Sequence, residues 1–172
     1  MPEAKLTETE NGLVPEGDGW FVLNARDASW VHGDRFGSAC FFEGETGFPE
    51  LGFNIGVTPA GEGTTMYHYE DAQEGFLVVG GEGIVIVEGE ERPVRVWDYF
   101  HCPAGTPHAM VAIGDEPFVV ISVGARRPGF KTVYPVDATA QKHDVGVDEE
   151  KTSGAYEGMT FERGRYRDGL LP

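Results

Sequence analysis

Two short segments of the chain carry residue types that bind metal ions. Residues 63–74 contain His68, Glu70 and Glu74, and residues 103–108 end in His108 after a Pro-x-Gly turn. Imidazole nitrogens and carboxylate oxygens are ligands of divalent transition metals such as Fe(II), Mn(II) and Zn(II). Val- and Ile-rich runs of high β-propensity separate the two segments. We therefore expect one mononuclear metal site assembled from two or more strands.

The spacing of these residues predicts how they meet. Residues two apart in a strand face the same side, so His68 and Glu70 should point into one pocket. Glu74 lies across a turn and can return to that pocket, whereas His108 enters from another strand. Glu70 is either a fourth ligand or a catalytic general base beside a three-ligand site with positions open for substrate or O2. A vacant pocket, in which the carboxylates pair with the imidazoles, is the alternative.

The elements that must hold these residues are short strands bounded by Gly and Pro. Such runs at such spacing predict an all-β, antiparallel jelly-roll barrel. We expect an N-terminal arm over 1–19, loose and Gly-rich, the barrel over 20–125 and a C-terminal extension over 126–172. The expected strands are 20–23, 37–42, 51–58, 64–70, 75–81, 83–88, 93–100, 108–113 and 118–123.

Composition excludes several kinds of partner. The chain has 172 residues, which suits one domain with extensions, and a formal net charge of −16. That charge disfavours nucleic acid and anionic membranes as partners. Cys40 and Cys102 are too few and too far apart for a disulfide scaffold. The first residues lack the pattern of a signal peptide, and no apolar run approaches the ~20 residues that cross a bilayer, so we expect a cytoplasmic protein.

The two metal-binding segments resemble the motifs of the cupin superfamily, in the form of a small single-domain, type-2 cupin barrel. One motif places His-x-His and a Glu before a Gly, matched here by His68, Glu74 and Gly81, with Glu70 where the second His is usual. The other is Pro-x-Gly-x-x-His, matched by residues 103–108; Trp97 stands at its earlier Gly position and Ala112 at its later Asn position.

The resemblance implies a metal-binding protein that acts on a small molecule. Cupins include oxygenases, decarboxylases and isomerases as well as non-catalytic binders, so whether this chain is an enzyme stays open. The implied metal ligands are His68, Glu70, Glu74 and His108, and the metal is Fe, Mn or Zn. The alternative is a non-catalytic ligand-binding or structural cupin with a vacant polar pocket. Cupins are commonly homodimers, and an edge strand at residues 20–23 is the expected pairing surface.

Overall fold

The regular secondary structure of the protein is almost entirely antiparallel β-sheet, as its computed structural model shows for residues 1–45 and 47–172. Thr46, between the expected strands 37–42 and 51–58, lies outside the described residues. Strands make up 47% of the chain and helix 3%, which confirms the predicted all-β class. The largest sheet has the strand order β10-β7-β12-β5-β4-β3-β14. Its strands are β3 (Ser29–Gly33), β4 (Ser38–Phe41), β5 (Leu51–Thr58), β7 (Glu74–Gly80), β10 (Tyr99–Cys102), β12 (Phe118–Ala125) and β14 (Phe161–Arg165).

A second sheet contains β8 (Glu82–Val87), β9 (Glu90–Arg95) and β11 (His108–Ile113), in the order β11-β8-β9. Isolated bridges from Gly63 to Val111 and from His68 to His108 lay the segment 63–68 along the free side of β11. The chain then continues into β6 (Tyr69–Glu70), which pairs with β13 (Thr132–Val133). Residues 64–70, predicted as one strand, thus join the second sheet to the C-terminal part of the chain.

Side chains alternate between the two faces of the large sheet, so the two faces have different surroundings. One face turns inward and lines a cavity, with Val31 from β3, Ala39 from β4 and Val120 from β12 among its residues. The other face packs against segments that follow or precede the sheet. It consists of Trp30, Cys40, Val57 and Val119, covered by Leu23, Ala25, Tyr166, Leu170 and Leu171. The cavity and the main outer core are therefore separated by one layer of backbone.

Three predicted elements differ from the structure. Residues 1–19 are not a loose arm, because β1 (Lys5–Thr9) and β2 (Gly12–Glu16) form a hairpin in which Gly12 adopts a φ of 115°. Residues 20–23 form no strand; Trp20 makes a single parallel bridge to Glu3, and Leu23 covers the outer core instead. The run 93–100 is split between β9 and β10 by a turn at Trp97, whose φ is 76°.

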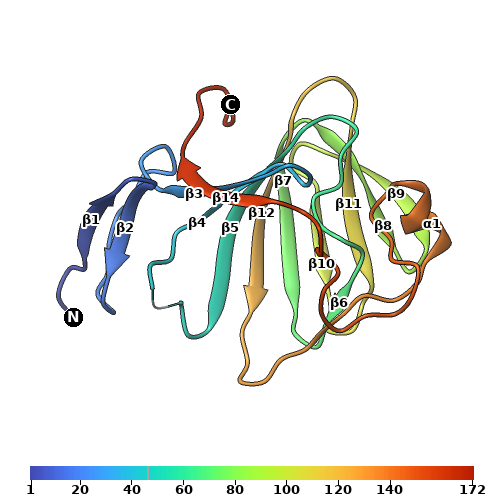
Figure 1. Cartoon of the computed structure of the whole chain (residues 1–172), viewed down its shortest axis with the longest axis horizontal. Helices are drawn as coiled ribbons and strands as arrows, with labels where there is room; N and C mark the ends of the chain where they lie inside the picture. The colour runs from blue at the N-terminus through green and yellow to red at the C-terminus, as the bar shows by residue number, and fades with distance from the viewer. Residues whose placement is uncertain (46) are drawn as a thin grey trace.

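The C-terminal extension is part of the folded body. Its last strand, β14, pairs antiparallel with β3 along five residues, from Phe161 opposite Gly33 to Arg165 opposite Ser29. Its short helix, α1 (Ala138–Lys142), is capped by Asp137, whose carboxylate accepts a hydrogen bond from the Ala140 amide at 2.8 Å. Figure 1 shows α1 and the β1–β2 hairpin at opposite ends of the molecule. No helix among the described residues is long and apolar enough to cross a membrane.

Candidate metal centre

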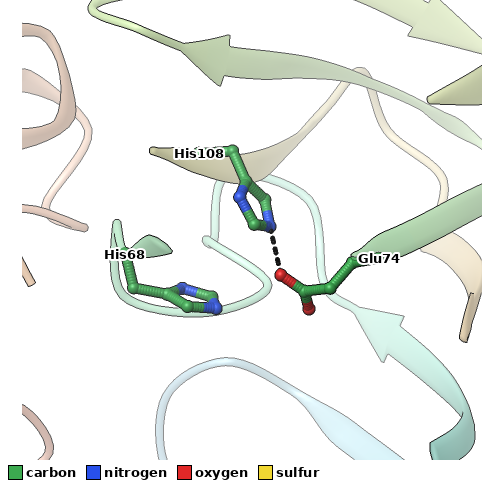
Figure 2. A group of neighbouring side chains, drawn as sticks. All are labelled: His68, Glu74 and His108. Carbon is green, nitrogen blue, oxygen red and sulfur yellow. Dashed lines mark ion pairs between the residues drawn. The ribbon is translucent and has the colours of Figure 1, made fainter. Parts of the chain in front are cut away.

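Three side chains from three segments converge inside the barrel. His68 lies just before β6, Glu74 begins β7 and His108 begins β11. Each offers one ligand atom, and these atoms all lie within 4.8 Å of one another. The Nε2 atom of His108 is 3.6 Å from Oε2 of Glu74. Figure 2 shows the two imidazoles and the carboxylate directed at a common space.

Backbone pairing places the two imidazoles side by side. The amide of His68 donates to the carbonyl of His108 at 3.0 Å, and the amide of His108 donates to the carbonyl of His68 at 2.8 Å. Residues that exchange both hydrogen bonds in an antiparallel pair present their side chains on the same face. The ring centroids are accordingly 4.9 Å apart. These two backbone hydrogen bonds thus bring together two histidines that lie far apart in the sequence.

Backbone carbonyls fix which nitrogen of each ring faces the cavity. Nδ1 of His68 lies 2.7 Å from the carbonyl oxygen of Met66, and Nδ1 of His108 lies 3.0 Å from that of Thr106. A carbonyl oxygen only accepts, so each Nδ1 carries the proton and each Nε2 keeps a lone pair for the cavity. Metal-bound histidines are held in the same way. The donor set therefore fits a divalent transition metal, and His68, Glu74 and His108 are the residues that would hold it.

Without a bound metal, burial favours the uncharged forms of the ionisable groups in the site. It lowers the pKa of His108 to about 4, with the nearby His68 adding to the effect and the Thr106 carbonyl opposing it. Burial also lowers the pKa of His68, against the carbonyl of Met66 and the charge of Glu70. The pKa of Glu74 is raised to about 8, first by burial and second by Glu70. Both imidazoles are thus neutral at pH 7, which is the form that binds metal.

Glu70 shares the cavity but not the cluster of three. It lines the same cavity as His68, and its Oε1 accepts a hydrogen bond from the hydroxyl of Thr132 at 3.3 Å. The β6–β13 pairing puts Thr132 directly opposite Glu70. The close ligand group contains His68, Glu74 and His108 only. A role for Glu70 as ligand or general base stays a prediction.

The three converging side chains open onto a cavity of about 600 Å³. Strands of the large sheet form most of its wall, and aromatic side chains such as Phe36 and Phe76 make much of it apolar. Thr132, Tyr134, Tyr156 and Phe161 of the C-terminal extension complete the lining. The ring of Tyr134 lies 5.8 Å from that of His68. Ligand pockets commonly have this size and this mixture of apolar walls and few polar groups.

Sequence reasoning missed the contribution of the C-terminal extension. Tyr134 and Tyr156 belong to no motif. Tyr134 directly follows β13, which pairs with β6, and the hydroxyl oxygen of Tyr156 accepts a hydrogen bond from the Met66 amide. Cys102, by contrast, is buried behind His108, with its Sγ 3.3 Å from Nδ1 of that ring. It faces the side of the imidazole opposite to the cavity and is a free thiol, as is Cys40.

The fold and the site define a class: a small antiparallel β-barrel with a His-His-Glu cluster inside. The cupin domain family model matches residues 55–124, which span β5 to β12 and include all three cluster residues. The chain therefore contains a cupin domain at residues 55–124.

The chain is similar to several known proteins. An uncharacterized protein of Methanocaldococcus jannaschii is 25% identical over 65 residues, which cover 38% of this chain and about half (52%) of that relative. A crystal structure named as a sugar phosphate isomerase from a cupin superfamily, from Silicibacter pomeroyi, is 20% identical and covers 86% of both chains with a TM-score of 0.53. The DMSP lyase DddQ from Ruegeria pomeroyi is 24% identical over 55% of this chain and 49% of its own, with a TM-score of 0.47.

Proposed function

We propose that this protein is a metal-dependent cupin enzyme that holds one divalent transition metal through His68, Glu74 and His108 and acts on a small organic molecule. The observation that carries the proposal is the orientation of the imidazoles. Both Nδ1 atoms are occupied by backbone carbonyls, which leaves both Nε2 atoms for the space that Glu74 also reaches. Purely structural histidines have no need of two free, converging ring nitrogens.

Three protein ligands leave coordination positions for a substrate. Two histidines and one carboxylate with open positions are typical of non-haem Fe(II) oxygenases and also occur in catalytic zinc sites. When bound, the metal supplies a Lewis acid for a substrate oxygen or, as Fe(II), a site for O2. The metal is Fe, Mn or Zn. The substrate enters the cavity of about 600 Å³ that adjoins the cluster.

Glu70 is placed to move a proton. Its carboxylate stands in the cavity wall, and Thr132 holds one of its oxygens at 3.3 Å. A carboxylate that is fixed by a hydrogen bond and stands beside an open metal site suits a general base better than a fourth ligand. We therefore assign Glu70 the proton-transfer role and the other three residues the metal.

Metal content tests this proposal directly. Protein stripped with chelator and reconstituted separately with Fe(II), Mn(II) and Zn(II) should retain close to one metal per chain, measured by elemental analysis after gel filtration. His68→Ala and His108→Ala should lose most of it. The matched control is His101→Ala, which removes an exposed imidazole on β10 and should keep the wild-type content. A chain that retains none of the three metals would overturn the proposal.

The alternative is a non-catalytic cupin with a vacant polar pocket. One observation favours it: Glu74 already lies 3.6 Å from His108, and Glu70 already has a partner in Thr132. The metal content of the wild type and the activity of Glu70→Gln separate the two functions. In an enzyme both chains hold metal, and Glu70→Gln loses the turnover that the wild type shows on its substrate. In a vacant binder the wild type already holds no metal.

A further inference from the structure

The chemical class of the ligand can be argued from the charges of the cavity, on the basis of the proposed metal site. The lining contains two carboxylates, Glu70 and Glu74, and two imidazoles, His68 and His108. Among the residues that the structure describes, no Lys or Arg lines it. We infer that the cavity takes an uncharged, partly apolar organic molecule that bears a hydroxyl or carbonyl oxygen, and that it excludes phosphate esters.

A charge count supports the uncharged class. A divalent metal brings two positive charges, and Glu70 and Glu74 bring two negative charges, so the occupied cavity is neutral before any ligand enters. A phosphate dianion would leave that enclosure with a net negative charge and no guanidinium or ammonium partner. Burying an unpaired charge is costly, and phosphate sites normally supply Arg, Lys or a helix N-terminus. The formal net charge of −16 adds a long-range repulsion of anions.

Three arginines on or beside strands of the large sheet do not line the cavity. Arg126 pairs with Glu43 and donates to the carbonyl of Phe48 at 2.9 Å. Arg35 donates to the carbonyl of Asp144, and its guanidinium lies over the ring of Phe36. Arg163 stands opposite Val31 in the β14–β3 register and is exposed. Arg163 is thus the one of these three that could reach an anion at the cavity wall, and the experiment includes it.

Tyr156 supplies a neutral donor suited to a substrate oxygen. Its phenolic oxygen accepts a hydrogen bond from the amide of Met66 at 3.2 Å, so its own O–H proton remains available for another acceptor. Edge-to-face contacts with Phe36, Tyr134 and Phe161 hold the ring in place, with centroid distances of 5.5, 6.1 and 5.9 Å. A fixed, uncharged O–H recognises a hydroxyl or carbonyl without requiring an anion.

The test uses Mn(II)-loaded protein and two probes that differ in charge, benzyl alcohol and benzyl phosphate. Mn(II) broadens the proton resonances of a probe that binds beside it, so binding is read without any turnover. Benzyl alcohol should be broadened in a saturable way, and its affinity should exceed that of benzyl phosphate by about tenfold or more, the scale of one lost charge-assisted contact. His68→Ala, which should not hold metal in the site, is measured with the same amount of Mn(II). It corrects for broadening by Mn(II) that is free or bound elsewhere.

Two variants change the number of positive charges at the cavity wall: Ser122→Lys adds one and Arg163→Gln removes one. Ser122→Lys puts a cation in the β12 wall of the cavity and should reverse the preference toward benzyl phosphate; Ser122→Met, of similar length without charge, should not. Equal or tighter binding of benzyl phosphate to the wild type, lost in Arg163→Gln, would overturn the inference, as would no binding of benzyl alcohol. Failure of the wild type to hold Mn(II), Fe(II) or Zn(II) would instead refute the proposed metal site, which keeps the two failures distinct.

Discussion

At the scale of single residues, Glu74 and His108 make the stability of the metal-free protein depend on pH in opposite directions. The pKa of Glu74 is raised from 4.5 to about 8 by burial and by Glu70, so its contribution to stability is full below pH 4.5 and lost as the pH rises through 8. The pKa of His108 is lowered from 6.5 to about 4 by burial and by His68, so its contribution is full above pH 6.5 and lost as the pH falls through 4.

Glu74→Gln should therefore flatten the alkaline half of this profile. Between pH 4.5 and 8 the wild type should lose on the order of 2–4 kcal/mol of unfolding free energy that the Gln variant does not lose. Urea unfolding of chelator-treated protein across this range measures the difference. Glu91→Gln, which removes an exposed carboxylate paired with His143, is the control and should follow the wild type. Parallel profiles for Glu74→Gln and the wild type would contradict the buried, protonated state.

Tyr156 links the cavity wall to a metal ligand through one residue. Its oxygen accepts the Met66 amide, and the Met66 carbonyl holds Nδ1 of His68. Tyr156→Phe leaves that buried amide without its acceptor, so we expect a loss of about 1–2 kcal/mol in unfolding free energy and a several-fold weaker metal affinity. Tyr166→Phe is a matched control, because its oxygen accepts the Leu171 amide on the outer face, far from the ligands. It should leave metal affinity unchanged.

Trp97 carries strain that a glycine would relieve. It stands in the turn between β9 and β10 with a φ of 76° and 74% of its surface exposed, so little packing compensates for the left-handed backbone. Related cupin motifs have Gly at this position, and the positive φ gives the physical reason. Trp97→Gly should stabilise the protein by about 0.5–1 kcal/mol, after the entropic cost of Gly is subtracted. Trp97→Ala keeps a Cβ and should show no such gain in thermal unfolding.

At the scale of elements, the sequence predicts individual strands but not the pairing of strands that lie far apart in the chain. The runs at 51–58, 75–81, 83–88, 108–113 and 118–123 are apolar, β-branched and bounded by Gly or Pro, and each is a strand or nearly coincides with one. The motif residues His68, Glu74 and His108 follow from the same local reasoning. Residues 20–23 look like a strand because they are apolar, but Leu23 packs against the outer core while Trp20 and Val22 are exposed.

Strand β14 shows what local patterns cannot supply. Its sequence, Phe-Glu-Arg-Gly-Arg, has no alternation of apolar and polar residues, and its partner β3 lies some 130 positions earlier in the chain. Gly164 suits the pairing, because a Cβ at this position would lie only 3.1 Å from the ring of His32. Tyr134 and Tyr156, which line the cavity, lie in the segment between the paired strands β13 and β14. The homodimer stays a prediction, and its expected edge at 20–23 is not a strand.

Removing β14 tests whether the extension belongs to the barrel. A chain ending at Gly158 loses the strand that pairs with β3 and the tail residues that cover Trp30, so we expect a large drop in the thermal midpoint and aggregation through the exposed edge. A chain ending at Asp168 keeps the strand but lacks Leu170 and Leu171, and it should show an intermediate loss. Thermal unfolding with light scattering separates the three chains. Equal midpoints would mean that β14 is only loosely attached.

At the scale of the whole molecule, metal binding and folding should be coupled. Ligand atoms from three segments come within 4.8 Å of one another only in the folded state, so an ion that they hold stabilises that state over the unfolded chain. At a free metal concentration about 100 times the dissociation constant, the gain is about 2.7 kcal/mol, which corresponds to a rise of roughly 5–10 °C in the midpoint.

The charge of the chain makes the control for this coupling essential. A protein of formal net charge −16 gains stability from any cation that screens its self-repulsion, so a rise in Tm with Zn(II) or Mn(II) alone proves little. Ca²⁺ has the same charge but prefers six to eight oxygen ligands, which the His-His-Glu cluster does not offer. At equal ionic strength, Zn(II) or Mn(II) should raise the wild-type Tm well beyond Ca²⁺, and in His108→Ala the effects of Zn(II) and Mn(II) should fall to the Ca²⁺ level. A variant that keeps the full metal-dependent rise would place the bound ion on the acidic surface instead of in the barrel.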